Sequence, residues 1–416
     1  MTAHALATPR RRGACPGLSA PMPTGDGLLV RLVPIGIMSL AAFAALCAAA
    51  RTHGNGVIEV TSRGSIQLRG LSASSAPPCA AAIADLRIAA EDGIPIHCNP
   101  LSGIDADEIF NAGALAAQLR HALAERSMAS GLSPKVSIAI DGGGQLDLRT
   151  LAADIRLSAR AVDGRVSLRV SAGGDEASAA DLGVIAPAEA IQTVVRLLEV
   201  LTARGRTARA RDVFAASGTD VDGTDKPGHD SIGMHLLRDG SYACGIGLAF
   251  GHAVASALER LAEVAATAGA SGLRAAPGRT LLAIGLTPQT AAEFVAAAAQ
   301  LGFIVLADDP RRYVIACAGA PICASAHIAA RALAPRIADQ AAARLGDALT
   351  IHISGCAKGC AQATAAALTV VGTAGGCALI ARGTTRDQPF ATVPADELPA
   401  AIAKYAREQS LEVENV

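Results

Sequence analysis

The chain has 416 residues, enough for several domains with a sizeable buried core. Lysine plus arginine (36) almost balance aspartate plus glutamate (37), so a nucleic-acid groove, which needs a concentrated basic face, is not expected. Hydrophobic residues make up 51% of the chain, but much of this is alanine, which adds little packing area and is weak evidence for a membrane protein.

The longest uncharged stretch, residues 33–50, reaches the minimum length of a membrane-spanning helix. Pro34 and Gly36 interrupt it near its start, so an alanine-rich helix packed on a sheet is the better interpretation. A secretory signal would place its apolar region nearer to Met1. We therefore expect a cytoplasmic protein with no membrane partner, in which clustered cysteines bind metal rather than form disulfides.

An internal duplication organises the chain. Residues 26–71 predict a strand, a helix, a strand, a turn and a strand, and residues 239–286 predict the same series. The later parts also correspond, since residues 94–105 align roughly with 315–326. Residues 205–230 are rich in Gly, Asp, Thr and Arg without an apolar period, which predicts a linker between the copies.

Four cysteines form two close pairs in the second copy. Five residues separate Cys317 from Cys323, and three separate Cys356 from Cys360, with glycines in both segments. Thiolates hold iron–sulfur clusters, four of them for a [4Fe–4S] cubane, and two short pairs on separate loops can close around one cluster. Zinc is the competing metal, although structural zinc sites favour shorter spacings, and four unrelated core cysteines are the third interpretation.

The other cysteines are isolated, and we interpret them as small core residues: Cys15, Cys47, Cys79, Cys244 and Cys377. Cys98 lies where the duplication places the Cys317 loop, but it lacks partner cysteines, so we expect it not to bind metal. A two-histidine, one-carboxylate iron site is not recognisable from the spacing of the histidines. No iron ligands are therefore predicted among His97, His235, His252, His327 and His352.

This cysteine pattern, on the second copy of a duplicated chain, resembles the sirohaem- and cluster-containing nitrite and sulfite reductases. In that superfamily a Thr-x-Arg-x-x-x-Gln-x-Arg-Gly strand helps to hold tetrapyrrole carboxylates, and the matching residues here are Thr61, Arg63, Gln67, Arg69 and Gly70. Guanidinium groups suit this role because they pair with carboxylates at two points and stay charged. Following the resemblance, we predict a basic substrate-binding set of Arg31, Arg63, Arg69 and Lys135.

The same resemblance implies an α+β, internally duplicated fold, in which paired ferredoxin-like half-domains join two mixed α/β-sheet domains. The expected ranges are 1–76 for the first half-domain, 77–204 for the first larger domain without a cluster, 205–231 for the linker, 232–300 for the second half-domain and 301–416 for the larger domain that binds the [4Fe–4S] cluster. The substrate is expected between the two halves, with arginines around its rim.

Within the superfamily, the chain resembles the precorrin-3B synthases over nearly its whole length, for instance in NPLSGID at 99–105 and SGCAKGCA at 354–361. It departs at Gln362-Ala363, where His-Pro is expected, and at Leu236, where proline is usual. The resemblance implies an NADH- and O2-dependent mono-oxygenase of aerobic cobalamin biosynthesis, which hydroxylates precorrin-3A at C20 and closes a γ-lactone to give precorrin-3B. It also implies a [4Fe–4S] cluster and a mononuclear non-haem iron.

Two alternatives stay open: a sirohaem-dependent sulfite or nitrite reductase, and a non-catalytic tetrapyrrole or cluster carrier. Gly245, Gly247 and Gly251 do not match a dinucleotide-binding loop, because their spacing is one residue too long and no acidic residue ends the following strand. We therefore expect the electrons of NADH to arrive from a separate reductase, with no nucleotide site on this chain.

Overall fold

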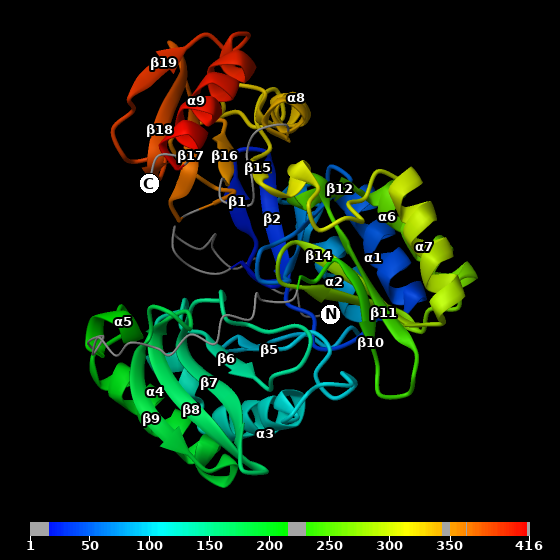
Figure 1. The fold of residues 1–416 in the computed structure, drawn as a ribbon, viewed down its shortest axis with the longest axis vertical. Coiled ribbons are helices and arrows are strands. Elements are labelled where there is room, and N and C mark those ends of the chain that lie inside the picture. Colours follow the sequence, from blue (N-terminus) through cyan, green and yellow to red (C-terminus); the bar gives the residue numbers. More distant parts are fainter. Residues whose placement is uncertain (1–15, 215–229, 343–349, 363, 414–416) are drawn as a thin grey trace.

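The computed structural model describes residues 16–214, 230–342, 350–362 and 364–413. Four β-sheets form two pairs of related topology, and Figure 1 shows the paired half-domains in the middle, with one larger domain at each end. Helices and strands alternate along the chain in two similar series. The predicted fold class, α+β with an internal duplication, is confirmed.

Each half-domain contains an antiparallel sheet, with the strand orders β1-β2-β4-β3-β12 and β10-β11-β14-β13. The first sheet consists of β1 (Met22–Thr24), β2 (Gly27–Leu32), β3 (Val57–Val60), β4 (Ile66–Leu71) and β12 (His252–Val254). The second sheet consists of β10 (Gly233–Leu236), β11 (Tyr242–Gly247), β13 (Gly272–Ala276) and β14 (Thr280–Leu286). Gly245 and Gly247 thus lie within a strand rather than in a loop.

The helices of the half-domains are α1 (Leu40–His53), α2 (Ala76–Asp85), α6 (Ala255–Thr267) and α7 (Pro288–Gln300). Ser39 begins α1 by accepting a hydrogen bond from the backbone of Ala42 at 3.2 Å. Phe43 of α1 and Leu261 of α6 belong to one core that both half-domains share. The uncharged stretch is therefore a packing helix, as predicted. Among the described residues, no helix is long and apolar enough to span a membrane.

The two half-domains exchange edge segments about a pseudo-twofold axis. β12, which leads into α6, pairs with β3 of the first sheet. In the same way, the segment that leads into α1 of the first half-domain pairs with the second sheet, where Met38 lies opposite Leu273 of β13. The equivalent β3–β4 and β13–β14 turns also meet, since Arg63 pairs with Pro277. Each half-domain sheet is therefore completed or extended by backbone from the other copy.

Leu258 of α6 is fully buried in the shared core, at 0% exposure. Leu258→Ala is expected to lower the free energy of unfolding by about 2–5 kcal/mol, because the lost methyl groups leave a cavity. Urea denaturation followed by circular dichroism measures the change. Met234→Ala, at a side chain that is 44% exposed, should change the free energy by less than about 0.5 kcal/mol. Equal losses in both variants would contradict the packing described.

Each larger domain contains a five-stranded sheet. Its first three strands run parallel to one another, and the fourth and fifth strands each run antiparallel to the strand before them. The first consists of β5 (Ile96–Cys98), β6 (Ile138–Asp141), β7 (Ala153–Val162), β8 (Arg165–Gly174) and β9 (Ala180–Ile185), with helices α3 (Ala112–Glu125), α4 (Ala190–Ala203) and α5 (Ala210–Val213). The second consists of β15 (Val314–Ala316), β16 (Ile351–Ser354), β17 (Ala366–Thr373), β18 (Gly376–Gly383) and β19 (Ala391–Val393), with helices α8 (Ala330–Ala342) and α9 (Leu398–Val413).

Residues 205–214, which we expected to begin the linker, pack on the first larger domain. Arg209 donates to both carboxylate oxygens of Asp154, at 2.8 and 2.9 Å, and Ala210 is fully buried. Asp154 is only 2% exposed, and a buried carboxylate needs such a partner. The chain therefore stays attached to this domain as far as Phe214. The rest of the expected linker, up to residue 229, lies outside the described residues.

Candidate functional site

The two cysteine pairs follow neighbouring parallel strands. Cys317 comes directly after β15, and Cys356 and Cys360 follow β16. The carboxyl ends of parallel strands lie at the same edge of a sheet, so the two loops meet there. Cys317 donates its backbone N–H to Ile353 at 3.1 Å, and Gly355 donates its N–H to the Sγ of Cys317 at 3.0 Å.

All four thiols lie within electrostatic reach of one another. Burial raises the pKa of Cys317, and the nearby thiols of Cys323 and Cys356 raise it further. Cys360 is the most exposed of the four, yet its pKa is also raised, by the partial burial of its sulfur and by the other three cysteines. Thiolates that disfavour one another's charge are stabilised when they share a metal centre. The four sulfurs therefore fit as ligands of one [4Fe–4S] cluster.

No three side chains of His, Cys, Asp or Glu come together to hold a single metal ion in the part of the chain that the structure describes. Four thiolates around a cubane are held farther apart than the ligands of a single zinc ion, which lie about 2.3 Å from the metal. The five-residue spacing between Cys317 and Cys323 is also longer than structural zinc sites favour.

The turn between β1 and β2 packs on the loop that carries Cys323. Gly25 accepts a backbone hydrogen bond from Ala324 at 2.9 Å. A Cβ atom at Gly25 would lie 2.1 Å from the Sγ of Cys323, so only glycine fits here without a shift. The two cysteine loops are also joined directly, because Lys358 donates to the hydroxyl of Ser325 at 2.6 Å.

Charged side chains gather between the first sheet and the second larger domain. Arg69 donates to Asp26 at 2.9 and 2.7 Å and to Glu59 at 3.1 Å. Glu59 also pairs with Arg331, in the first turn of α8, at 2.8 Å. Burial opposes the charge of Arg69, but the two carboxylates outweigh it and raise the pKa of the guanidinium. The predicted substrate ligand Arg69 is therefore already paired with protein carboxylates.

The other predicted substrate residues lie in three different surroundings. Arg31, on β2, donates to the amide oxygen of Gln67 at 2.6 and 2.9 Å. The amide is oriented so that its nitrogen also donates to Glu59, at 3.0 Å. Arg63 is exposed in the β3–β4 turn, and Lys135 is exposed ahead of β6. Arg31 and Arg69 thus share one face of the sheet, and Arg63 lies at the pseudo-twofold axis. The described contacts do not join Lys135 to them.

Sequence reasoning missed three further arginines near these sites. Arg331 contacts Glu59, while Arg274 and Arg279 come from the β13–β14 hairpin. Arg279 adopts a left-handed backbone conformation, with φ of 65°, which is strained for a residue other than glycine. The internal duplication could have identified Arg274. It is the equivalent of Glu59, because Arg274 pairs with Leu282 as Glu59 pairs with Gln67.

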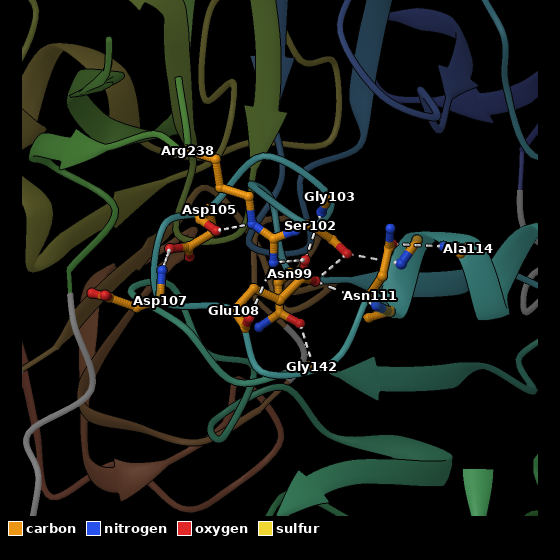
Figure 2. A network of polar contacts seen from close by, with 12 residues as sticks. Asn99, Ser102, Gly103, Asp105, Asp107, Glu108, Asn111, Ala114, Gly142 and Arg238 are labelled. Atoms are coloured by element: carbon orange, nitrogen blue, oxygen red, sulfur yellow. Dashed lines mark hydrogen bonds and ion pairs between the residues drawn. The ribbon is translucent and has the colours of Figure 1, made fainter. Parts of the chain in front are cut away.

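A hydrogen-bonded network takes the place of the cysteines in the first copy (Figure 2). Asn99 follows β5 as Cys317 follows β15, and it accepts the N–H of Gly142 at 2.6 Å, as Cys317 accepts that of Gly355. The expected alignment of residues 94–105 with 315–326 is thus three residues out of register, and Cys98 corresponds to Ala316, the residue before Cys317. The thiol of Cys98 instead donates to the carbonyl of Ala112, at 3.7 Å.

Carboxylates and an arginine complete this network. Six residues after Asn99, Asp105 stands where the second copy has Cys323. Glu108 accepts hydrogen bonds from the hydroxyl of Ser102 and, at 2.7 Å, from the backbone of Gly103. Arg238, from the β10–β11 turn, donates to the carbonyl of Asp105 at 2.8 Å. The first copy therefore closes its loop with hydrogen bonds rather than thiolates.

His352 of β16 is fully buried, and neither ring nitrogen has a hydrogen-bond partner. Burial, assisted by the charge of Arg279, lowers its pKa to about 4. An unfolded histidine titrates near 6.5, so the unfolded chain binds the proton first as the pH falls. Stability is therefore complete above pH 6.5 and declines between pH 6.5 and 4, by up to about 3 kcal/mol for this group.

Urea denaturation at pH 7.5 and pH 5 tests this expectation. The His352→Leu chain should lose less stability between the two pH values than the parent chain. His97 and His252, whose pKa values are also lowered to about 4, first by burial, remain in both chains, so their contributions cancel. An equal loss in the two chains would show that His352 does not carry the effect.

Comparison with known proteins identifies the fold and the family. Residues 20–86 match the family described as the nitrite/sulfite reductase ferredoxin-like half domain. The chain is 39% identical over 406 residues to a precorrin-3B synthase of Sinorhizobium sp., a match that covers 95% of this chain and 88% of the relative. The NirA protein of Mycobacterium tuberculosis shares the fold, with a TM-score of 0.72 and 18% identity over 91% of this chain and 80% of that one. The chain therefore belongs to the precorrin-3B synthase family and has the nitrite/sulfite reductase fold.

Proposed function

We propose that the protein is an oxygen-dependent mono-oxygenase of aerobic cobalamin biosynthesis, which converts precorrin-3A into precorrin-3B by hydroxylation at C20 and closure of a γ-lactone. The observation that carries the proposal is the 39% identity to a precorrin-3B synthase over 95% of the chain. One oxygen atom of O2 enters the substrate and the other leaves as water, which requires two electrons and two protons. NADH is the ultimate source of the electrons, through a separate reductase.

Four side chains would hold the cluster: Cys317, Cys323, Cys356 and Cys360. A [4Fe–4S] cluster bound there supplies one-electron transfer. The N–H of Gly355, 3.0 Å from the Sγ of Cys317, stabilises negative charge on that sulfur and so helps to set the potential. The mononuclear iron implied by the family would complete the cofactors, and no residue is assigned to it.

The substrate carries several carboxylates, so its site needs a basic rim. Arg63 lies exposed where the two half-domains meet and is one of the charges that lower the pKa of His97, after burial. It can therefore offer a two-point contact to a substrate carboxylate. His97 stays neutral at pH 7, because its pKa is about 4, and does not compete for that carboxylate. Arg31, on the neighbouring sheet face, is the second proposed contact. Lys135, exposed ahead of β6, is the third proposed contact.

A sirohaem-dependent sulfite or nitrite reductase is the second candidate. The Thr61–Gly70 motif favours it, because its residues match the strand with which those reductases hold sirohaem carboxylates. A fold supports more than one chemistry, so the likeness to NirA does not decide between the two. The substrate and sirohaem have similar shapes and charges, and the same arginines would serve either.

Analysis of iron, acid-labile sulfide and extractable tetrapyrrole in anaerobically purified protein separates these candidates. We expect about four sulfides per chain, more iron than sulfide, and no sirohaem. Addition of precorrin-3A, a reductant system and O2 should then give a product heavier by one oxygen atom. About one sirohaem per chain would instead assign the protein to the reductases. A bound pigment without oxygen consumption would indicate a carrier.

A further inference from the structure

The guanidinium of Arg69 is fully engaged with protein carboxylates. Its Nε and Nη2 bind the two oxygens of Asp26, and its Nη1 binds Glu59. The side chains of Arg69 and Asp26 are 10% and 1% exposed. All three nitrogens therefore have partners inside the protein. Turning Arg69 toward a substrate would leave the buried charge of Asp26 unpaired, which costs several kcal/mol by order of magnitude.

Asp26 connects this ion pair to a cluster ligand. It belongs to the β1–β2 turn, where Thr24 donates to its carboxylate at 2.8 Å. The neighbouring Gly25 accepts the backbone N–H of Ala324, directly after Cys323, at 2.9 Å. A Cβ atom at Gly25 would lie only 2.1 Å from the Sγ of Cys323, so the turn limits where that sulfur can lie.

Glu59 connects the same ion pair to the far end of the cysteine loop. It binds Arg331 at 2.8 Å, in the first turn of α8, and α8 begins where the loop ends. Gly319, near the start of the loop, lies so close that a Cβ there would be 2.3 Å from the backbone nitrogen of Ala330. The connected ion pairs of Asp26, Arg69, Glu59 and Arg331 therefore act on the segment that carries Cys323 at two places, beside Cys323 through the β1–β2 turn and at its carboxyl end through Arg331.

The contact between the second half-domain and the larger domain without a cluster can be compared with the contact that Arg69 makes. Because Arg274 pairs with Leu282 as Glu59 pairs with Gln67, Ile284 occupies the position of Arg69. Ile284 packs in an apolar cluster with Leu101 and Leu237. Apolar contacts thus take the place of the Arg69 ion pair at this position, while Arg238 supplies charged contacts elsewhere in the same interface. A charged side chain is therefore not needed at this strand position for the half-domain to pack, so the charge of Arg69 beside the cysteines calls for another explanation.

We propose that Arg69 is a positioning residue for the cluster rather than a substrate ligand. Together with Asp26 and Glu59, it holds the β1–β2 turn against the Cys323 loop and offsets negative charge next to the cluster. This inference rests on the proposed function, because it takes the four cysteines as the cluster ligands. It replaces the expected role of Arg69 and leaves those of Arg31 and Arg63 as proposed.

Five single variants of the full-length protein test the proposal: Arg69→Met, Arg69→Lys, Gly25→Ala, Gly17→Ala and Arg63→Met. A Cβ at Gly17 would meet nothing within 4 Å, so Gly17→Ala is the control for Gly25→Ala. Neither glycine has a positive φ, which leaves the contact with Cys323 as the difference between them. Three quantities are measured: the reduction potential of the cluster by EPR-monitored titration, the rate of iron loss to a chelator, and the anaerobic Kd for precorrin-3A.

Arg69→Met should lower the cluster potential, because it removes a nearby positive charge, and speed iron loss about tenfold or more, with Kd within about twofold of the parent. Arg69→Lys keeps the charge and should restore most of the potential, although not the two-point bond. Gly25→Ala should reduce cluster content, and Gly17→Ala should not. Arg63→Met should show the opposite pattern, with a weaker Kd and an unchanged potential.

A tenfold weaker Kd for Arg69→Met, with parental potential and iron-loss rate, would overturn the proposal and return Arg69 to the substrate site. Should Arg69→Met be insoluble, Gly25→Ala decides, since a full and stable cluster in that variant overturns the claim equally. Parent protein without acid-labile sulfide would contradict the proposed function instead. The positioning claim is then tested by iodoacetamide labelling of Cys323, read by mass spectrometry, which should be faster in Arg69→Met. An unchanged labelling rate would overturn it.

Discussion

Replacement of Cys356 by serine is expected to remove the cluster and to abolish hydroxylation of precorrin-3A. The four thiols converge at one edge of the β15–β16 pair, where burial and the other cysteines raise the pKa of Cys317 and Cys360. The loss of one thiol leaves three ligands for a cubane that needs four. Electrons from the reductase would then have no carrier inside the protein. We expect sulfide content and the EPR signal of the reduced cluster to fall to background, with turnover below detection.

A matched variant separates cluster loss from misfolding. Cys377 lies in the same domain, on β18, where it is 0% exposed, and burial alone raises its pKa, without a contribution from the four converging cysteines. Cys377→Ala should keep its sulfide and its EPR signal, at a modest loss of stability. A Cys356→Ser protein with parental sulfide content would rule out the proposed ligand set.

Loss of Arg63 is expected to have the second largest effect. Arg63→Met should weaken the binding of precorrin-3A by roughly tenfold to a hundredfold, because a charge-assisted contact to a carboxylate is worth about 1.5–3 kcal/mol. Arg63→Lys should recover part of this affinity, since it keeps the charge but not the two-point geometry. Fluorescence or absorbance titration of the anaerobic protein measures the Kd.

The control for this prediction is Arg165→Met, at another exposed arginine. Arg165 begins β8 at the β7–β8 hairpin, in the first larger domain and away from the half-domain contact. Its replacement should leave the Kd unchanged. If Arg63→Met binds as tightly as Arg165→Met, Arg63 does not line the substrate site.

The cysteines and the duplication could be found from sequence, because both are local or periodic signals. Cys317 with Cys323, and Cys356 with Cys360, are close in the chain, and the strand–helix–strand series repeats as a unit. Register could not be fixed in the same way. Cys98 and Asn99 are adjacent, and only the observed strand pairing shows that Asn99 occupies the place of Cys317.

The environment of the arginines was beyond sequence reasoning for a different reason. Arg69 is separated by 43 positions from its partner Asp26, and Arg331 by 272 positions from Glu59. A motif identifies an arginine but not the carboxylate that neutralises it, since that partner is chosen by tertiary packing. Whether protein carboxylates already balance the charge of a guanidinium therefore has to come from the structure.

The exchange of edge segments has a consequence for how this protein can be divided. An arrangement in which each copy adds backbone to the other's sheet is the geometry of a symmetric dimer, here contained in one polypeptide. A fragment that stops at Phe214 would lack β12 and leave β3 as an uncovered strand, ready to pair with a second molecule or to aggregate. The two halves should thus be soluble only when produced together, as complementary pieces of a split enzyme.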